Sequence, residues 1–480
     1  MQHTLFPEIY RSELAECVGF LAAPLLILNN ILHSDGREAI ITAIKRDQEE
    51  QSKARALLRD QIYKGGGVNR HMNPELVLLF LTSRAFYPDC YGERGYQLLL
   101  ESESIKNFLA NRAISTFPSQ STVHEQVTAV SETTLVLLNQ SVLSYAKELK
   151  CDDMSAAIID STAIEANSAW PVDSSLLKRL AAKLSSRLSR AHAKMSVRSQ
   201  RSCSLSQLLK NCDKLAGLDF YISNFKGKRG APKKRSDAYH EILNRCESII
   251  QRVKFVISKL LPFMDLVEKE LFNQTFKMFQ NKVLSVSYRF DRAPDSYDPK
   301  TSPKVNSIGD NEAVFIKKGG RETVFGYRPS FSFSINGFMV CHTIELGNTS
   351  DSKAFNEVLK KHEEMAKTKP AFISVDDGYC AAANLDEAIT QGASVISFSG
   401  SKGKKLLGAT LYDSEQYRLA RHIRSASEAG ISQIKNTYRF KRFSVCGIDR
   451  IRQEMGICMF GYNISRIVAL IMRREETIAA

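Results

Sequence analysis

The spacing of hydrophobic residues predicts helices over the first 150 residues of the chain. Pro74 begins an apolar helical run through Phe80, and Thr122 with Glu125 forms a capping box that opens a helix toward Leu138. Short helices joined by tight turns can build a DNA-binding helix-turn-helix or an ordinary helical bundle. The pattern alone leaves both alternatives open.

Beyond residue 150 the apolar runs shorten, and the pattern predicts strands. Residues 156–160 and 371–376 read as buried strands, and each run ends at a carboxylate, Asp160 and Asp376. Residues 394–398 form a third run of this kind. In open α/β sheets, sites form at the carboxyl ends of the strands, so both aspartates become candidates for chemistry. Asp377 is an alternative to Asp376, but the strand-Asp-x-Gly-Tyr spacing favours Asp376.

A hairpin and several helices complete the predicted elements. Alternating residues 331–335 and 338–344 flank Asn336-Gly337, a strong hairpin signal. Further helical patterns cover about 174–283, 413–430 and 461–475. We therefore expect a helical N-terminal domain at 1–150 and a mixed α/β domain at 151–480, which a helical stretch interrupts at about 175–285.

Composition narrows the class of protein. The chain has 480 residues, a pI near 9.2, and ten cysteines that never come closer than nine positions. Zinc-finger and C-x-x-C redox patterns are therefore excluded, and scattered single cysteines suit a reducing cytoplasm. The apolar run at residues 17–28 is too short to span a bilayer, and no basic stretch precedes it as in a signal peptide. We expect a soluble cytoplasmic protein.

The positive charge is local. Residues 175–236 hold 16 Lys or Arg and two acids, so this stretch carries the whole net charge of +14. Seven of these cations recur at steps of three or four and are predicted to form one helical stripe. They are Arg179, Lys183, Arg187, Arg190, Lys194, Arg198 and Arg201. A basic Gly/Pro-broken loop follows, with Lys228, Arg229, Lys233, Lys234 and Arg235.

Aligned cations without acids at i,i+4 repel one another, which favours a polyanionic partner over a merely solvated helix face. Contact with a nucleic-acid backbone is the preferred interpretation. An anionic membrane surface is the weaker alternative, because the neighbouring apolar stripe from Leu177 to Met195 lacks Trp and Phe.

The last candidate group is Arg421, Arg424, Glu428 and Lys435, whose spacing predicts one face of a helix. One carboxylate between cations is explained if Glu428 holds a metal ion and the cations hold phosphates. The alternative is a salt-bridged helix face with Arg424 and Glu428 as an i,i+4 pair. Gly430 counts against a regular helix here, because a mid-helix glycine costs about 1 kcal/mol.

These residues carry a resemblance. Asp160-Ser-Thr, Asp376-x-Gly-Tyr and Arg424-x3-Glu428-x6-Lys435 resemble, in their order and spacing, the signature blocks of bacterial insertion-sequence transposases of the DDE class. Further short motifs support the resemblance: Gly326-Tyr-Arg328, Gly347-Asn-x-x-Asp351, Pro118-x-x-Ser121-Thr122 and Gly461-Tyr-Asn463. The resemblance leaves out residues 180–285. Arg421 stands where the family usually has Tyr, which puts a role for this position in doubt.

The resemblance implies an RNase H-like catalytic domain with a mostly helical insertion, preceded by an all-α domain that binds the transposon ends. It implies that Asp160, Asp376 and Glu428 are ligands of two Mg²⁺ ions, for which Mn²⁺ can substitute. The expected activity is cleavage at transposon ends and strand transfer into target DNA, with Arg424 and Lys435 on the DNA phosphates. The partners would be double-stranded DNA and further copies of the chain, as a homodimer or higher oligomer, in a bacterial cytoplasm at the nucleoid.

Two other classes share these features. A stand-alone RNase H-like nuclease would use the same carboxylates without strand transfer. A non-catalytic DNA-binding descendant of a transposase would fold alike without binding metal.

Overall fold

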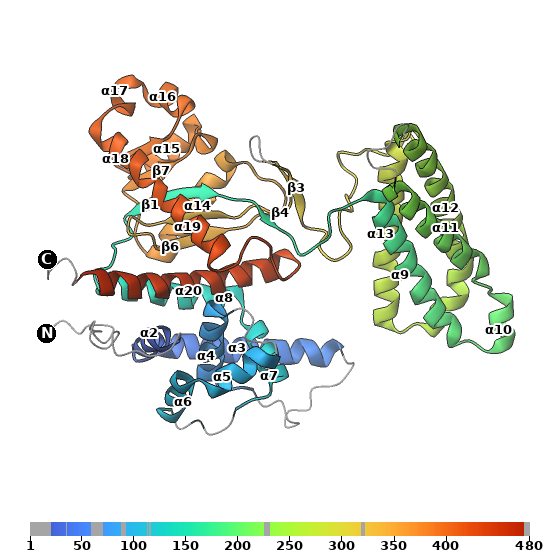
Figure 1. Cartoon of the computed structure of the whole chain (residues 1–480), viewed down its shortest axis with the longest axis horizontal. Helices are drawn as coiled ribbons and strands as arrows, with labels where there is room; N and C mark the ends of the chain where they lie inside the picture. The colour runs from blue at the N-terminus through green and yellow to red at the C-terminus, as the bar shows by residue number, and fades with distance from the viewer. Residues whose placement is uncertain are drawn as a thin grey trace. The chain divides into compact units, whose positions relative to one another are not determined.

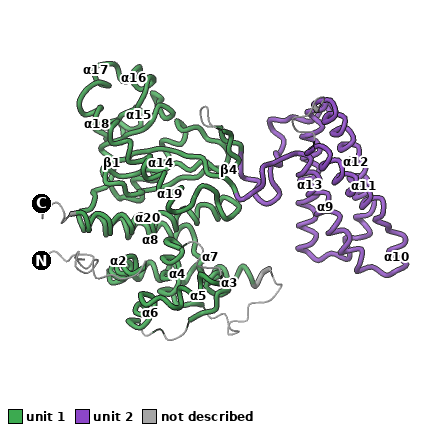
Figure 2. Tube along the Cα trace, viewed as in Figure 1, with its two compact units in different colours: residues 1–166, 315–480 green, residues 167–314 purple. Residues whose placement is uncertain are grey.

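The computed structural model describes residues 21–34, 36–58, 71–87, 93–112, 114, 117–224, 231–317 and 322–474. The chain divides into two compact units (Figure 2). Unit 1 consists of residues 1–166 and 315–480, and unit 2 consists of residues 167–314.

Unit 1 is built on a mixed five-stranded sheet with the order β6-β5-β1-β7-β8 (Figure 1). Its strands are β1 (Ala156–Ser161), β5 (Ser330–Phe333), β6 (Met339–Thr343), β7 (Phe372–Val375) and β8 (Val395–Phe398). β5 is antiparallel to both β1 and β6, whereas β1, β7 and β8 run parallel. The predicted strands and the hairpin are confirmed, and the chain is a mixed, helix-rich α/β protein.

Helices cover both faces of this sheet. Ser332 on β5 contacts His362 of α14 (Asp351–Ala366), and the next residue, Phe333, lies against Gly430 of α19 (Ser425–Asn436). Successive strand residues point to opposite faces, so α14 and α19 lie on opposite sides of the sheet. α18 (Glu415–Ile423) packs on β7 and β8.

A smaller sheet and short helices complete this part of unit 1. The small sheet has the order β2-β4-β3, from β2 (Ile164–Glu165), β3 (Val314–Ile316) and β4 (Val324–Tyr327). The short helices are α15 (Ala382–Thr390), α16 (Ser401–Leu407) and α17 (Ala409–Tyr412), together with the 3₁₀ turn η3 (Asp377–Tyr379).

Helix α20 (Ile448–Arg474) lies on β6 and packs against three of the N-terminal helices, α8, α4 and α2. The N-terminal helices are α2 (Ala22–Leu32), α3 (Arg37–Leu58), α4 (Pro74–Phe86), α5 (Glu93–Glu101), α6 (Glu103–Ala110), α7 (Gln120–Ala129) and α8 (Glu132–Glu148). α20 is long and apolar enough to cross a membrane, but most of its apolar window is buried inside the fold. This burial by α8, α4, α2 and β6 is typical of a core helix.

One predicted helix start is wrong. The capping box at Thr122 was expected to open a helix toward Leu138, but α7 begins two residues earlier, at Gln120. Ser119 caps it by accepting the Thr122 backbone N–H. α7 ends at Ala129, and Ser131 caps a separate helix, α8.

Unit 2 is helical. Its helices are α9 (Asp173–Ala193), α10 (Val197–Ser202), α11 (Ser206–Asn224), α12 (Ala231–Leu260) and α13 (Leu266–Tyr288). The 3₁₀ turn η2 (Leu261–Phe263) joins α12 to α13. The apolar stripe from Leu177 to Met195 lies in one core cluster with residues of α11, α12 and α13, so its predicted docking on a core is confirmed.

The predicted single basic stripe is wrong. α9 ends at Ala193, and Ser196 caps the separate helix α10, so Arg198 and Arg201 do not continue the α9 face. The predicted basic loop is also partly wrong, because Lys233, Lys234 and Arg235 lie in the first turns of α12. Lys228 and Arg229 lie outside the described residues.

Candidate active site

Asp160 and Asp376 lie at the same edge of the main sheet. β1 and β7 are parallel neighbours, and Ile159 pairs with Val375. Asp160 follows Ile159 and Asp376 follows Val375, so the two aspartates lie side by side at the ends of adjacent strands. Asp160 is buried, and its Oδ1 accepts the Ser161 backbone N–H at 2.7 Å. Asp376 is half-buried. Both carboxylates therefore stand where open α/β sheets form their sites.

The neighbouring Asp377 has a different task. Its Oδ2 accepts the backbone N–H of Lys402 at 3.1 Å, and its Oδ1 accepts that of Gly403 at 3.0 Å. These groups belong to the first turn of α16, so Asp377 ties this helix to the turn after β7. By contrast, Asp376 Oδ1 accepts the N–H of Gly378, two residues away in its own turn, at 2.8 Å. This geometry favours Asp376 over Asp377 as the site residue.

Arg424 connects the third candidate carboxylate to the first. Its Nη2 lies 2.5 Å from Glu428 Oε1, and its Nη1 lies 3.9 Å from Asp160 Oδ2. The Glu428 side chain is 58% exposed, whereas that of Asp160 is 12% exposed. The structure therefore gathers Asp160, Arg424 and Glu428 into one cluster, with a cation between the two carboxylates.

Lys435 lies at the other end of α19. Its Nζ donates to the Ala163 backbone carbonyl at 2.9 Å, just beyond β1. The lysine thus joins α19 to the segment that follows Asp160.

The four residues Arg421, Arg424, Glu428 and Lys435 were predicted to lie on one helix. That prediction is wrong. α18 ends at Ile423 and α19 begins at Ser425, with Arg424 as the residue between them. Arg421 belongs to α18, where its Nη1 donates to the Tyr412 carbonyl at 2.5 Å and its guanidinium covers the Tyr412 ring at 3.9 Å. Arg421 is therefore engaged in packing α17 against α18.

The structure explains why a glycine occupies position 430 within a helix, which the sequence did not indicate. A Cβ at this position would lie 2.5 Å from Cε1 and 2.7 Å from Cζ of Phe333. No side chain fits at such distances, so the glycine allows α19 to approach β5. This close approach holds the helix of Glu428 on the sheet that carries Asp160.

A buried polar group behind the two aspartates was missed as part of the site. Ser161 Oγ donates to Asp351 Oδ1 at 2.6 Å, and Asp351 Oδ2 forms an ion pair with Arg328 Nη2. In the sequence, Arg328 and Asp351 stand out only as members of short motifs, Gly-Tyr-Arg and Gly-Asn-x-x-Asp, that resemble those of DDE-class transposases. The sequence does indicate a helix that begins at Asp351. A helix start does not predict that the side chain is buried, so this pattern does not identify Asp351 as part of the site.

The same region encloses Tyr379. Its side chain is fully buried beside Phe355, and burial together with the nearby Asp351 carboxylate raises the pKa of its hydroxyl. Tyr379 thus stays neutral and forms part of the apolar support of the turn after Asp376.

The donor set fits a hard divalent cation, because the three candidate ligands are all carboxylates. In the described part of the chain, no group of three His, Cys, Asp or Glu side chains lies close enough to hold a metal ion. The Arg424 guanidinium lies between two of the candidate carboxylates, Asp160 and Glu428.

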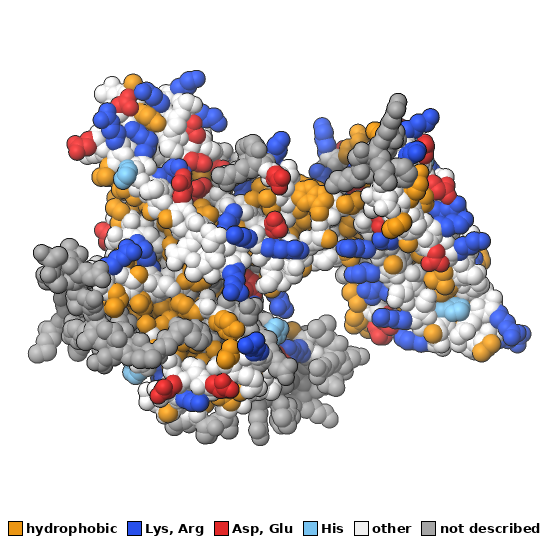
Figure 3. Space-filling view, viewed as in Figure 1, with side chains coloured by type: hydrophobic (Ala, Val, Ile, Leu, Met, Phe, Trp, Pro, Cys, Tyr) orange, Lys and Arg blue, Asp and Glu red, His pale blue; other side chains and the backbone are white. Residues whose placement is uncertain are grey.

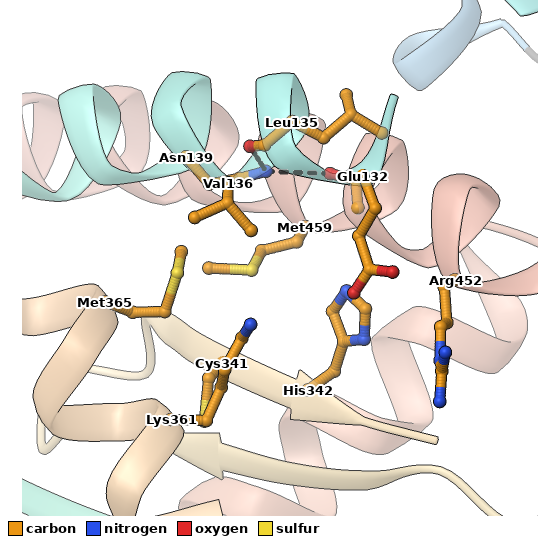
Figure 4. Close-up of a pocket in the computed structure, with 11 residues that line it drawn as sticks. Glu132, Leu135, Val136, Asn139, Cys341, His342, Lys361, Met365, Arg452 and Met459 are labelled. Atoms are coloured by element: carbon orange, nitrogen blue, oxygen red, sulfur yellow. Dashed lines mark hydrogen bonds between the residues drawn. The ribbon is translucent and has the colours of Figure 1, made fainter. Parts of the chain in front are cut away.

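A small enclosed cavity lies away from these carboxylates (Figure 4). It measures about 20 Å³ and lies between α8, β6, α14 and α20, with Asn139, His342 and Met459 among its lining residues. Neither Asn139 Oδ1 nor His342 Nδ1 has a hydrogen-bond partner among the described residues. A space of this size can hold about one water molecule.

Basic side chains are scattered over the face of unit 2 that Figure 3 shows, among hydrophobic, acidic and other side chains. Arg179, Lys183 and Arg190 on α9 are exposed and have no ion-pair partner among the described residues; we call these three the α9 basic face. Lys194 differs, because it pairs with Glu268 at 2.9 Å. Arg187 is half-buried.

The fold and the site define a class. Paired carboxylates at the ends of adjacent parallel strands, with cations beside them, are suited to reactions of phosphate esters assisted by divalent ions. The family comparison is more specific, because residues 296–464 match the model of the family described as "Transposase DDE domain". The resemblance to DDE-class transposases is thereby confirmed.

The match supports transposase function in general, with DNA as the substrate. It includes Asp376, Glu428 and Lys435, whereas Asp160 lies ahead of it. Comparison with curated proteins and with solved structures gives no match.

Proposed function

We propose that this chain is a DNA transposase that cleaves DNA at transposon ends and transfers the strands into target DNA. Asp160, Asp376 and Glu428 are its catalytic carboxylates, on an RNase H-like fold. The carrying observation is the placement of Asp160 and Asp376 at adjacent strand ends, with Arg424 joining Glu428 to Asp160. The strand order, three antiparallel strands followed by two parallel ones, supports the fold assignment.

The three carboxylates would hold two Mg²⁺ ions, or Mn²⁺ in their place. When bound, such ions activate the attacking oxygen and stabilise the leaving oxygen of an in-line displacement. The residues of this chain would supply hard oxygen ligands at the edge of the sheet. Arg424 and Lys435, near the two ends of α19, would bind DNA phosphates beside Glu428.

The basic surface of unit 2 would grip the DNA backbone. The α9 basic face provides three exposed cations, and Arg187, Lys194, Arg198, Arg201 and the cations from Lys228 to Arg235 extend this proposed DNA contact. Such contacts add affinity without reading base sequence. We assign end recognition to the helices of residues 1–150. Action on DNA as a homodimer or higher oligomer, at the bacterial nucleoid, completes the proposal.

The test is cleavage of a DNA substrate that carries the element's own ends, in Mg²⁺. Asp160→Asn, Asp376→Asn and Glu428→Gln should each abolish cleavage and leave DNA binding intact in a mobility-shift assay. Asp377→Asn is the matched control, because this carboxylate caps α16 and should be dispensable for the chemistry. Near-normal cleavage by any of the three variants refutes the assignment of that residue.

The product distinguishes the alternatives. Joining of the cut ends to a target plasmid identifies a transposase. Cleavage that depends on the carboxylates but never joins ends identifies a nuclease. DNA binding without either reaction identifies a non-catalytic descendant.

A further inference from the structure

Asp351 is a buried carboxylate that the proposed chemistry does not use. It is the first residue of α14, and its side chain is 9% exposed. Its Oδ1 accepts a hydrogen bond from Ser161 Oγ at 2.6 Å, and Ser161 directly follows Asp160 on β1. One hydrogen bond and one peptide unit therefore separate Asp351 from the first catalytic aspartate.

Asp351 reaches the second catalytic aspartate through Gly378. A Cβ at position 378 would lie 2.8 Å from Asp351 Oδ2 and 3.0 Å from Asp376 Oδ1. Both oxygens thus lie against the same point, and the turn after β7 has no room for a side chain there. Asp376 also accepts the Gly378 N–H, so its position depends on this turn.

Arg328 supplies the compensating charge. It lies between β4 and β5, and its side chain is 15% exposed. Its Nη2 pairs with Asp351 Oδ2, its Nε donates to Ser161 Oγ at 3.3 Å, and its Nη1 lies 3.4 Å from the Thr349 carbonyl. The guanidinium is thus held by two segments, the start of α14 and the end of β1, which carries Asp160.

We propose that Asp351 and Arg328 are a positioning pair for the metal-binding carboxylates, an inference that rests on the proposed function. Asp351 holds Arg328 so that its guanidinium does not pair with Asp160 or Asp376. The pair also fixes Ser161 and the Gly378 turn, and with them the spacing of the two aspartates. Arg424, at the start of α19, contacts Asp160 itself, whereas Arg328 contacts Ser161, the residue after Asp160.

A direct binding assay tests this role without relying on catalysis. Mn²⁺ binding to the full chain is measured by electron paramagnetic resonance, which distinguishes free from bound Mn²⁺. Asp351→Asn should weaken Mn²⁺ binding about tenfold, the lower end of the effect of losing a residue that orients metal ligands. The freed Arg328 then competes with the metal for Asp160 and Asp376.

The double variant Asp351→Asn/Arg328→Gln separates positioning from stability. Because it removes the competing cation as well, it should recover most of the Mn²⁺ affinity that Asp351→Asn loses. The matched control is Glu454→Gln, which breaks the Arg84–Glu454 pair between α4 and α20. The Arg84 and Glu454 side chains are 12% and 11% exposed, so this pair is buried to a similar degree. The control should lower stability and leave Mn²⁺ affinity unchanged.

Three results would overturn the inference. Asp351→Asn could bind Mn²⁺ as the wild-type chain does, the double variant could bind as weakly as the single one, or the Glu454→Gln control could lose the same affinity. If Asp351→Asn does not fold, Ser161→Ala decides, since it removes only the bridging hydroxyl: weaker binding supports the pair, and unchanged binding refutes it.

Failure of the proposed function gives a different pattern. In that case the wild-type chain binds no Mn²⁺ that Asp160→Asn removes, and the inference falls with it. If Asp160→Asn removes Mn²⁺ binding while Asp351→Asn has no effect, only the inference is wrong.

Discussion

Gly430→Ala is expected to destabilise unit 1, although alanine is the better helix former. Gly430 lies within α19, where the change to alanine would add about 1 kcal/mol of helix stability if space allowed. The new Cβ, however, would lie 2.5 Å from a ring carbon of Phe333. That ring is fully buried and packs against the rings of Phe331 and Tyr462, so it has no free direction in which to move.

Overpacking of this kind costs about 1–3 kcal/mol, against the gain of about 1 kcal/mol in helix propensity. We therefore expect a net loss of up to about 2 kcal/mol in the free energy of unfolding. The matched control is Gly217→Ala within α11, where a Cβ would meet no atom within 4 Å. This control should gain about 1 kcal/mol, because helix propensity acts there without opposition.

Urea-induced unfolding followed by circular dichroism measures both variants against the wild-type chain. Gly430→Ala should also reduce DNA cleavage while the chain is still folded, because an outward shift of α19 moves Glu428 away from Asp160. The reasoning is refuted if Gly430→Ala stabilises the chain as Gly217→Ala does, since α19 would then not lie this close to β5.

Two further predictions concern pH and salt. His362 Nε2 donates to the Met154 carbonyl (3.0 Å), so Nδ1 of the neutral ring accepts from Ser332 Oγ (2.8 Å). Burial lowers the pKa of His362 from 6.5 to about 4. The unfolded chain therefore binds a proton first, so the free energy of unfolding should fall by up to about 1.4 kcal/mol per unit as the pH drops from 6.5 toward 4. His362→Gln should flatten this slope in urea titrations between pH 6.5 and about 5, and an equally steep slope would contradict the assignment. Changing the three cations of the α9 basic face to alanine should reduce the slope of log K against log salt for DNA binding by up to about 3. An unchanged slope would show that this face does not contact DNA.

Local patterns predicted the strands of the main sheet well. Each strand is a short apolar run bounded by turn residues, and Asn336-Gly337 marks the hairpin because Gly337 adopts a positive φ of +77°. The ends of β1 and β7 were predicted to within one residue, so Asp160 and Asp376 could be named as candidates at the carboxyl ends of strands, whereas the pairing of β1 with β7 is seen only in the structure.

Helix boundaries were harder, because helical spacing continues across a break. The α9 cations keep their spacing through residues 194–196, yet Ser196 starts a new helix there. Likewise, α18 and α19 share one periodic pattern although Arg424 separates them.

The contacts between distant segments could not be predicted. Asp351, Arg328 and Ser161 meet through three elements that are far apart in the sequence, and only the folded chain brings them together. The need for glycine at position 430 is likewise not predictable from local sequence, because it arises from the Phe333 ring on β5, a different element.

The insertion of unit 2 has a consequence for the order in which the chain folds during synthesis. β1 is the central strand of the main sheet, but its partners β5 and β7 begin only at Ser330 and Phe372. At about 5–20 residues per second, the ribosome needs on the order of ten seconds to make the intervening chain. Unit 2 can fold in this interval, whereas the apolar β1 must wait for its neighbours. The main sheet can therefore form only after the whole of unit 2 has been synthesised.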